Sequence, residues 1–192
     1  MANTEHGKLA KQGGEAWNKW REEHGDTVPD ISGEQLHGVD LKEADLSEVK
    51  MTETLLTKAD FSGANLQNAN MEEANLWGAN LEGANLSNTN LTRANLRNTK
   101  MSGANLENAN MDGAELLFGD LTGANLKSVN LSSAMFVHTD LTGTDLSGAN
   151  LQDIQNWNDI KSIDKTNLSG VVNPPDGFLE WAKENGAIVD GE

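Results

Sequence analysis

A large apolar residue falls on every fifth position from Leu36 to Leu151 without a break. Leu is the usual residue, Met or Phe replaces it in places, and a small residue, most often Ala, stands two positions before it. Asn or Asp commonly lies between the two, as in Ala64-Asn65-Leu66. A unit this short, repeated this often, constrains the architecture more than any other feature of the chain.

A period of five fits neither an α-helix nor a flat strand. On a helix of 3.6 residues per turn the apolar residues would spread over all faces, and on a strand an odd spacing would place them on alternating faces. Each unit must therefore turn a corner and direct its own apolar residue to a common axis. The chain is expected to coil as a polygon, with backbone N–H and C=O groups pairing between successive coils at the ~4.8 Å strand spacing.

The units resemble those of the pentapeptide repeat family, whose motif is A-(N/D)-L-x-x. The motif is read directly at Ala64-Asn65-Leu66 and at Ala104-Asn105-Leu106, and the resemblance covers residues 31–153. It implies an all-β solenoid, a right-handed four-sided β-helix with twenty residues per coil. The run from Leu36 to Leu151 would then form about six coils, a rod of roughly 29 Å at that spacing.

The two flanks do not follow the five-residue period. Residues 1–30 are predicted to form an N-terminal cap with one helix between Gly14 and Gly25, because Trp17 and Trp20 share a helical face there. Residues 154–192 are predicted to form an irregular final coil and a C-terminal helical cap. A stack of coils exposes unpaired backbone edges at both ends, and caps are the usual remedy.

One wall of the predicted rod stands out. With twenty residues per coil, this wall contains the units centred on Leu36, Leu56, Leu76, Leu96, Leu116 and Phe136. The large apolar residues in positions that should face outward all belong to it, and they are Leu55, Trp77, Leu117, Phe118, Met135 and Val137. With Arg97 and His138 among them, they are predicted to form a stripe that binds a protein partner, a second copy of the chain included. The alternative is coverage by the chain itself, through Leu9, Trp17 or the C-terminal tail.

The charge of the chain argues against direct nucleic-acid binding. The formal net charge is −16, and residues 31–153 carry 17 Asp and Glu against 7 Lys and Arg. Phosphates would be repelled by this surface. An acidic rod could instead imitate DNA, and some members of the family inhibit DNA gyrase or protect it from quinolones. A DNA mimic that modulates a topoisomerase is therefore the alternative function, although between Ala74 and Lys100 the acidic surface is broken, since Glu82 is the only acid there.

No catalytic pattern is present in the sequence. The chain has no cysteine, its four histidines lack the spacing of metal ligands, and no phosphate-binding loop or nucleophile motif occurs. No apolar run approaches the length of a membrane span. We therefore expect a bacterial, cytoplasmic, non-enzymatic interaction scaffold without a cofactor or a metal.

Overall fold

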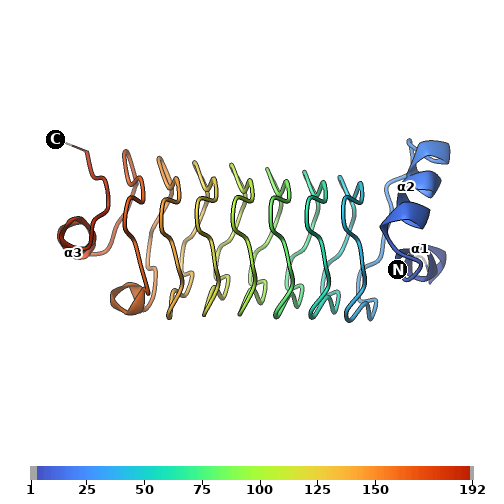
Figure 1. Ribbon diagram of the computed structural model, residues 1–192, viewed down its shortest axis with the longest axis horizontal. Coiled ribbons are helices and arrows are strands. Elements are labelled where there is room, and N and C mark those ends of the chain that lie inside the picture. Colours follow the sequence, from blue (N-terminus) through green and yellow to red (C-terminus); the bar gives the residue numbers. More distant parts are fainter. Residues whose placement is uncertain (1–3, 191–192) are drawn as a thin grey trace.

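The computed structural model describes residues 4–190 as a narrow stack of coils with helices at its two ends (Figure 1). Two helices, α1 (Thr4–Ala10) and α2 (Gly14–Glu23), lie at the N-terminal end. A 3₁₀ helix, η1 (Trp157–Asp159), and helix α3 (Phe178–Glu184) lie toward the other end. Residues 1–3 and 191–192 of the two predicted caps lie outside the described part.

Successive coils pair in parallel through single residues twenty positions apart. Leu55 pairs with Asn75, and Asp60 pairs with Asn80. Four such bridges occur in every coil, so the predicted four-sided coil of twenty residues is confirmed. We number the coils 1 to 6 from the one that begins with the Leu36 unit.

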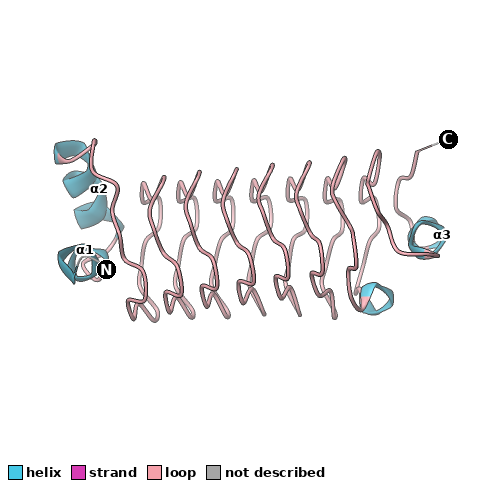
Figure 2. Ribbon diagram, turned by 180° about the vertical axis from the view of Figure 1, so that it is seen from behind, coloured by secondary structure: helices cyan, strands magenta, loops and turns pink. Residues whose placement is uncertain are grey.

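The expectation of an all-β chain is wrong in one respect. Within residues 4–190 there is no extended strand, and Figure 2 shows the coils as loop throughout. The reason lies in the unit length, because each unit ends in a turn and leaves only one residue per wall in a bridge. The right-handed sense of the coil stays a prediction.

Each unit closes with a tight turn. In the unit centred on Phe61, the N–H of Ala64 donates to the Phe61 carbonyl at 2.9 Å, and Gly63 has a left-handed φ of 66°. Phe61 and Ala64 point into the core and are buried. The other three positions face outward. We call the position before the central apolar residue the first slot, and the two positions after it the second and third slots.

Replacing a central leucine tests the inward assignment. Leu106 is fully buried, so Leu106→Ala is expected to lower the free energy of unfolding by about 2–5 kcal/mol through lost burial and a cavity. Leu106→Asn should lower it further, because the amide would lie in a dry core without a partner. Urea unfolding of both variants, with the outward Glu107→Gln as control, is the measurement. An Asn variant as stable as wild type would contradict the assignment.

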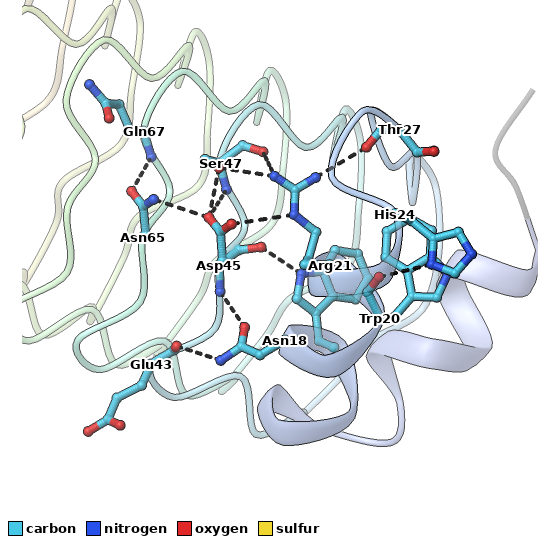
Figure 3. Close-up of polar contacts among 11 residues, drawn as sticks. Asn18, Trp20, Arg21, His24, Thr27, Glu43, Asp45, Ser47, Asn65 and Gln67 are labelled. Atoms are coloured by element: carbon cyan, nitrogen blue, oxygen red, sulfur yellow. Dashed lines mark hydrogen bonds and ion pairs between the residues drawn. The ribbon is translucent and has the colours of Figure 1, made fainter.

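Helix α2 covers the first coil by pairing with its free backbone edge (Figure 3). The buried Trp17 donates from Nε1 to the Asp45 carbonyl at 2.7 Å. Asn18 accepts from the Asp45 N–H at 2.7 Å and donates to the Glu43 carbonyl at 3.0 Å. The N–H of Gly14 donates to the Asp40 carbonyl at 3.0 Å. The bonds to the Asp45 N–H and to the Asp45 and Asp40 carbonyls satisfy groups that the preceding coil satisfies elsewhere in the stack.

The sequence predicted one N-terminal helix, and the structure has two. Helix α1 was missed because its seven residues are too few to show a helical period. The predicted helix corresponds to α2, which ends at Glu23 with His24 as its C-cap, one residue before Gly25. Gly14 is required at the contact itself, since a Cβ there would lie 2.6 Å from the Lys42 carbonyl oxygen.

The irregular stretch after coil 6 is a two-residue insertion. Bridges up to Met135 with Gln155 keep the offset of twenty, whereas Asp145 pairs with Asn167 at an offset of 22. Helix η1 lies between these points and takes up the extra residues. The unit around Leu168 therefore returns to the stack, with Leu168 buried. Helix α3 then packs by Phe178 and Ala182, which are buried, and Trp157 of η1 contacts the rings of Phe178 and Trp181.

Removal of the N-terminal helices is expected to expose the paired edge of the first coil. A chain lacking residues 1–30 should associate end to end or aggregate, because its free N–H and C=O groups can pair with another chain. Size-exclusion chromatography with light scattering compares it with the full chain. A monomer with an unchanged melting temperature would remove the capping role.

Asp45 and Asp60, which fill first slots, are held as carboxylates by their own turns. At Asp45, partial burial acts to raise the pKa, but hydrogen bonds from the Ser47 hydroxyl and N–H, and the charge of Arg21, outweigh it and lower the pKa. The same balance lowers the pKa of Asp60, through Ser62 and Lys42. A lowered folded-state pKa means that the carboxylate stabilises the fold at pH values above the unfolded pKa.

Acid should therefore remove the contribution of Asp45. Asp45→Asn is expected to lower the free energy of unfolding by about 1 kcal/mol at pH 7, because Arg21 loses its partner. The difference between wild type and variant should shrink as the pH falls below about 3.9, where the unfolded carboxyl is protonated, and vanish below the folded pKa. Urea unfolding at pH 7, 5, 4 and 3 measures this difference. A gap that is constant over this range would show that Asp45 does not act as a carboxylate.

Candidate functional site

The apolar wall consists of the outward residues of the units centred on Leu36, Leu56, Leu76, Leu96, Leu116 and Phe136. Bridges join Leu55 to Asn75 and Glu115 to Met135 along it, so the spacing in sequence becomes a line in space. The eight predicted site residues all belong to this wall, and they are Leu55, Trp77, Arg97, Leu117, Phe118, Met135, Val137 and His138. They occupy coils 2 to 6.

The most prominent apolar side chains of the wall face solvent. Leu55 is 41% exposed, Trp77 is 39% exposed and Phe118 is 54% exposed. Leu117, Met135 and Val137 are half-buried between their neighbours. Coverage by the chain's own ends is therefore wrong for residues 4–190, since Trp17 is buried against the first coil and α3 packs at the opposite end.

Two aromatic side chains of the wall have partners in neighbouring coils. The Phe118 ring lies 5.3 Å from the His138 ring, and the Lys58 ammonium lies 5.3 Å from the Trp77 ring centre. Both contacts join residues close to twenty positions apart. Lys58 was missed in the sequence, although its place in the third slot of coil 2, beside the second slot of coil 3, was a signal that could have found it.

Phe118 has a backbone conformation that a bulky side chain rarely adopts. Its φ is 58°, in the left-handed region, as for every third slot of this wall. Gly38, Gly78 and Asn98 fill that slot in coils 1, 3 and 4. Gly and Asn tolerate this conformation, whereas a large aromatic residue is strained by it. The fold itself gains little from Phe118, since this residue is more exposed than Trp77 or Leu55.

The charge of the wall differs from that of the rest of the rod. Its outward slots hold two cations, Lys58 and Arg97, and a single carboxylate, Glu115. Arg97 Nε is buried and lies 2.9 Å from a Glu115 oxygen. Each of the other three walls carries more carboxylates than cations in its outward slots. The apolar wall is thus the face of this acidic rod on which carboxylates do not predominate.

The corner beside Phe118 is polar. Asp140 pairs with Lys161 at 2.9 Å, and Asp120 lies in the same column one coil earlier. Partial burial acts to raise the pKa of Asp140, but hydrogen bonds from Thr142 and Lys161 outweigh it, and the pKa is lowered. These groups form a charged margin to the apolar wall, an arrangement typical of protein interfaces with an apolar centre and a polar rim.

The acidic side chains and histidines of the described residues do not gather into a metal site. Among residues 4–190, no group of three or more His, Asp or Glu side chains is placed to hold a metal ion. None of the helices in this range has the length and apolar character needed to cross a membrane. Asp45, Asp60 and Asp140 are each held by a turn residue two positions later, in the way Asn is held in other coils.

Comparison with known proteins identifies the repeat. A family model described as pentapeptide repeats matches in eight copies, over residues 35–72, 69–108, 89–127 and 124–155. A search of curated proteins gave no match.

Some solved structures also resemble the chain in part. A pentapeptide repeat protein from the thylakoid lumen of Arabidopsis thaliana is 33% identical, with 52% of this chain aligned to 63% of that one and a TM-score of 0.39. The chain thus spans less than two thirds of that protein. QnrB1, a plasmid-mediated fluoroquinolone resistance protein, is 17% identical over 84% of both chains, with a TM-score of 0.50. HetL, a pentapeptide repeat protein involved in heterocyst differentiation regulation from the cyanobacterium Nostoc sp. strain PCC 7120, is 23% identical over 83% of this chain and 84% of its own, with a TM-score of 0.30.

The identity to QnrB1 is low, so this likeness concerns the fold alone. The family model, in contrast, covers well over half of the sequence, from residue 35 to residue 155. The chain belongs to the pentapeptide repeat family.

Proposed function

We propose that this protein is a non-enzymatic interaction scaffold that binds a protein partner through the apolar wall of a right-handed, four-sided β-helix. The observation that carries the proposal is the exposed, strained Phe118, which lies on the same wall as the exposed Trp77 and Leu55. The left-handed backbone of Phe118 is strained, and Gly or Asn would fill the same slot with less strain, so the Phe side chain indicates a role outside folding. Aromatic, Met and Arg side chains are also the residues enriched at the centres of protein interfaces.

Phe118→Asn separates binding from folding. Asn fills the same slot at position 98 with a φ of 57°, so the variant is expected to be as stable as wild type or more stable by about 0.5–1 kcal/mol. Combined with Trp77→Ser, it should abolish capture of the partner from a lysate of the native host. The control is Gln67→Ser with Asn108→Ser, which changes exposed residues in the same slots of another wall.

Affinity capture with mass spectrometry, together with urea unfolding of each variant, measures both effects. Partner proteins retained by the double wall variant as well as by wild type would overturn the proposal. A double variant that loses the partner because it unfolds would be recognised by its urea curve. We place this activity in the bacterial cytoplasm, and the fraction of the native host that contains the protein tests that placement.

A topoisomerase-directed DNA mimic is the second candidate. It is supported by the excess of carboxylates on three of the four walls and by the lowered pKa values of Asp45, Asp60 and Asp140, which keep those groups charged. A gyrase supercoiling assay distinguishes the two functions. Inhibition, or protection from a quinolone, that survives the double wall variant would favour the mimic, because it would come from the acidic walls.

A further inference from the structure

The apolar wall has an order along the rod that interface composition alone does not explain. Its third slots read, from coil 1 to coil 6, Gly38, Lys58, Gly78, Asn98, Phe118 and His138. The first half of this column holds both of its glycines, and the second half holds both of its ring side chains. Its second slots place Trp77 in coil 3 and Arg97 in coil 4, next to the middle of the wall.

We propose that the wall binds a second copy of this chain, with the two rods antiparallel and coil 1 opposite coil 6. This inference rests on the proposed function and names its partner. A two-fold axis that lies in the interface, perpendicular to the long axes of both rods, reverses the order of the coils. The same axis leaves each column opposite the same column of the other copy. Coil 3 of one copy then faces coil 4 of the other, and coil 2 faces coil 5.

This register places each glycine of the third column opposite a larger residue. Gly38 faces the partner's His138, and Gly78 faces the partner's Asn98. Thr57 in coil 2 faces the partner's Leu117. Because the contact is symmetric, each pair occurs twice. A parallel arrangement, with the two-fold axis along the rods, would instead set each coil against its own copy and reverse the columns, so that Phe118 would face the partner's Glu115.

The register also pairs cations with aromatic rings. Trp77 faces the partner's Arg97, and Lys58 faces the partner's Phe118. The Arg97 side chain is 43% exposed, and within residues 4–190 its Nη atoms donate no hydrogen bond, so the guanidinium can stack on a ring. A guanidinium or ammonium over an aromatic face is attracted by the ring quadrupole. Glu115 would face the partner's Leu55, and its charge is already compensated by Arg97.

The charge of the chain selects this wall over the others for self-association. Two copies with a net charge of −16 each repel one another, and the carboxylate-rich walls would bring like charges together. The apolar wall has two cations against one carboxylate in its outward slots. Six coils give a contact roughly 29 Å long. Such a contact is short for a permanent dimer, so a dissociation constant on the order of 1–100 µM is expected.

Sedimentation equilibrium from about 5 to 500 µM protein is the first test. Wild type should dimerise within this range, and Trp77→Ser should raise the dissociation constant at least tenfold. Gln67→Ser, in the same slot of another wall, should leave it unchanged. A wild-type chain that stays monomeric throughout the range overturns the inference.

Cross-linking tests the register, since the chain contains no cysteine of its own. A mixture of Thr57→Cys and Leu117→Cys chains, treated with a short bismaleimide, should give a mixed cross-linked dimer well above either chain alone. Gln67→Cys mixed with Lys127→Cys, the same slots and coils on another wall, should not. If Thr57→Cys cross-links to itself as well as to Leu117→Cys, the antiparallel register is wrong.

The outcomes for the two proposals are distinguishable. A monomeric chain that captures a different protein through the wall overturns self-association and leaves the scaffold function standing. A chain that neither dimerises nor binds any protein through the wall overturns both.

Discussion

Backbone pairing at an offset of twenty residues is the constraint on which the rest of this structure depends. In each bridge one N–H donates to the coil ahead and another donates to the coil behind, as when Leu66 donates to the Asn85 carbonyl at 2.7 Å and Asn85 donates to the Ala64 carbonyl at 2.9 Å. The offset is kept only if every wall has five residues. One insertion would displace every later column, and the two extra residues of the chain lie at η1, where the regular stack ends. The same pairing leaves an unsatisfied edge on the first coil, which is why Trp17 and Asn18 bond to backbone groups rather than to side chains.

The identity of the first-slot residue follows from this stacking. An Asn side chain accepts the N–H two residues later through its oxygen and donates its amide to the residue twenty positions earlier. Asn125, Asn105, Asn85 and Asn65 donate in this way down one column, and the column ends on Asp45. Asp can only accept, so it suits the end of a column, where Arg21 rather than another coil supplies the next donor. This accounts for an Asp where the N-terminal cap meets the stack, and it makes a catalytic reading of Asp45 unnecessary.

Much of the architecture could be predicted because a five-residue period admits few solutions. The coil, the inward position of Leu106 and the common wall of Trp77 and Phe118 all follow from counting along the chain. The absence of extended strands could not be predicted from the sequence. A residue that forms a single bridge and a residue in the middle of a strand give the same sequence pattern. Helix α1 did not follow either, since seven residues are too few to carry a periodic signal. The exposure of Trp77 could not be deduced, because nothing in the sequence stated that the ends of the chain pack on the ends of the rod rather than along its side.

In this stack the inward residues determine the stability of the fold, whereas the outward residues determine the chemistry of the surface. An inward residue such as Leu106 is surrounded by the core, whereas an outward residue touches little besides the residues one coil away. Outward columns can therefore change with small effect on stability, and a residue that costs stability there needs another explanation. Phe118 is such a residue, since Gly or Asn would fit its left-handed backbone with less strain and Gly78 and Asn98 do so in the preceding coils. Lys58 and His138 share that conformation and lie beside the aromatic rings of the wall. On this wall the third slots of coils 2, 5 and 6 thus hold residues that take part in its ring contacts, whereas Glu73 and Arg93 adopt the same backbone conformation on another wall without such contacts. What distinguishes these slots is therefore the ring contact and not the backbone conformation.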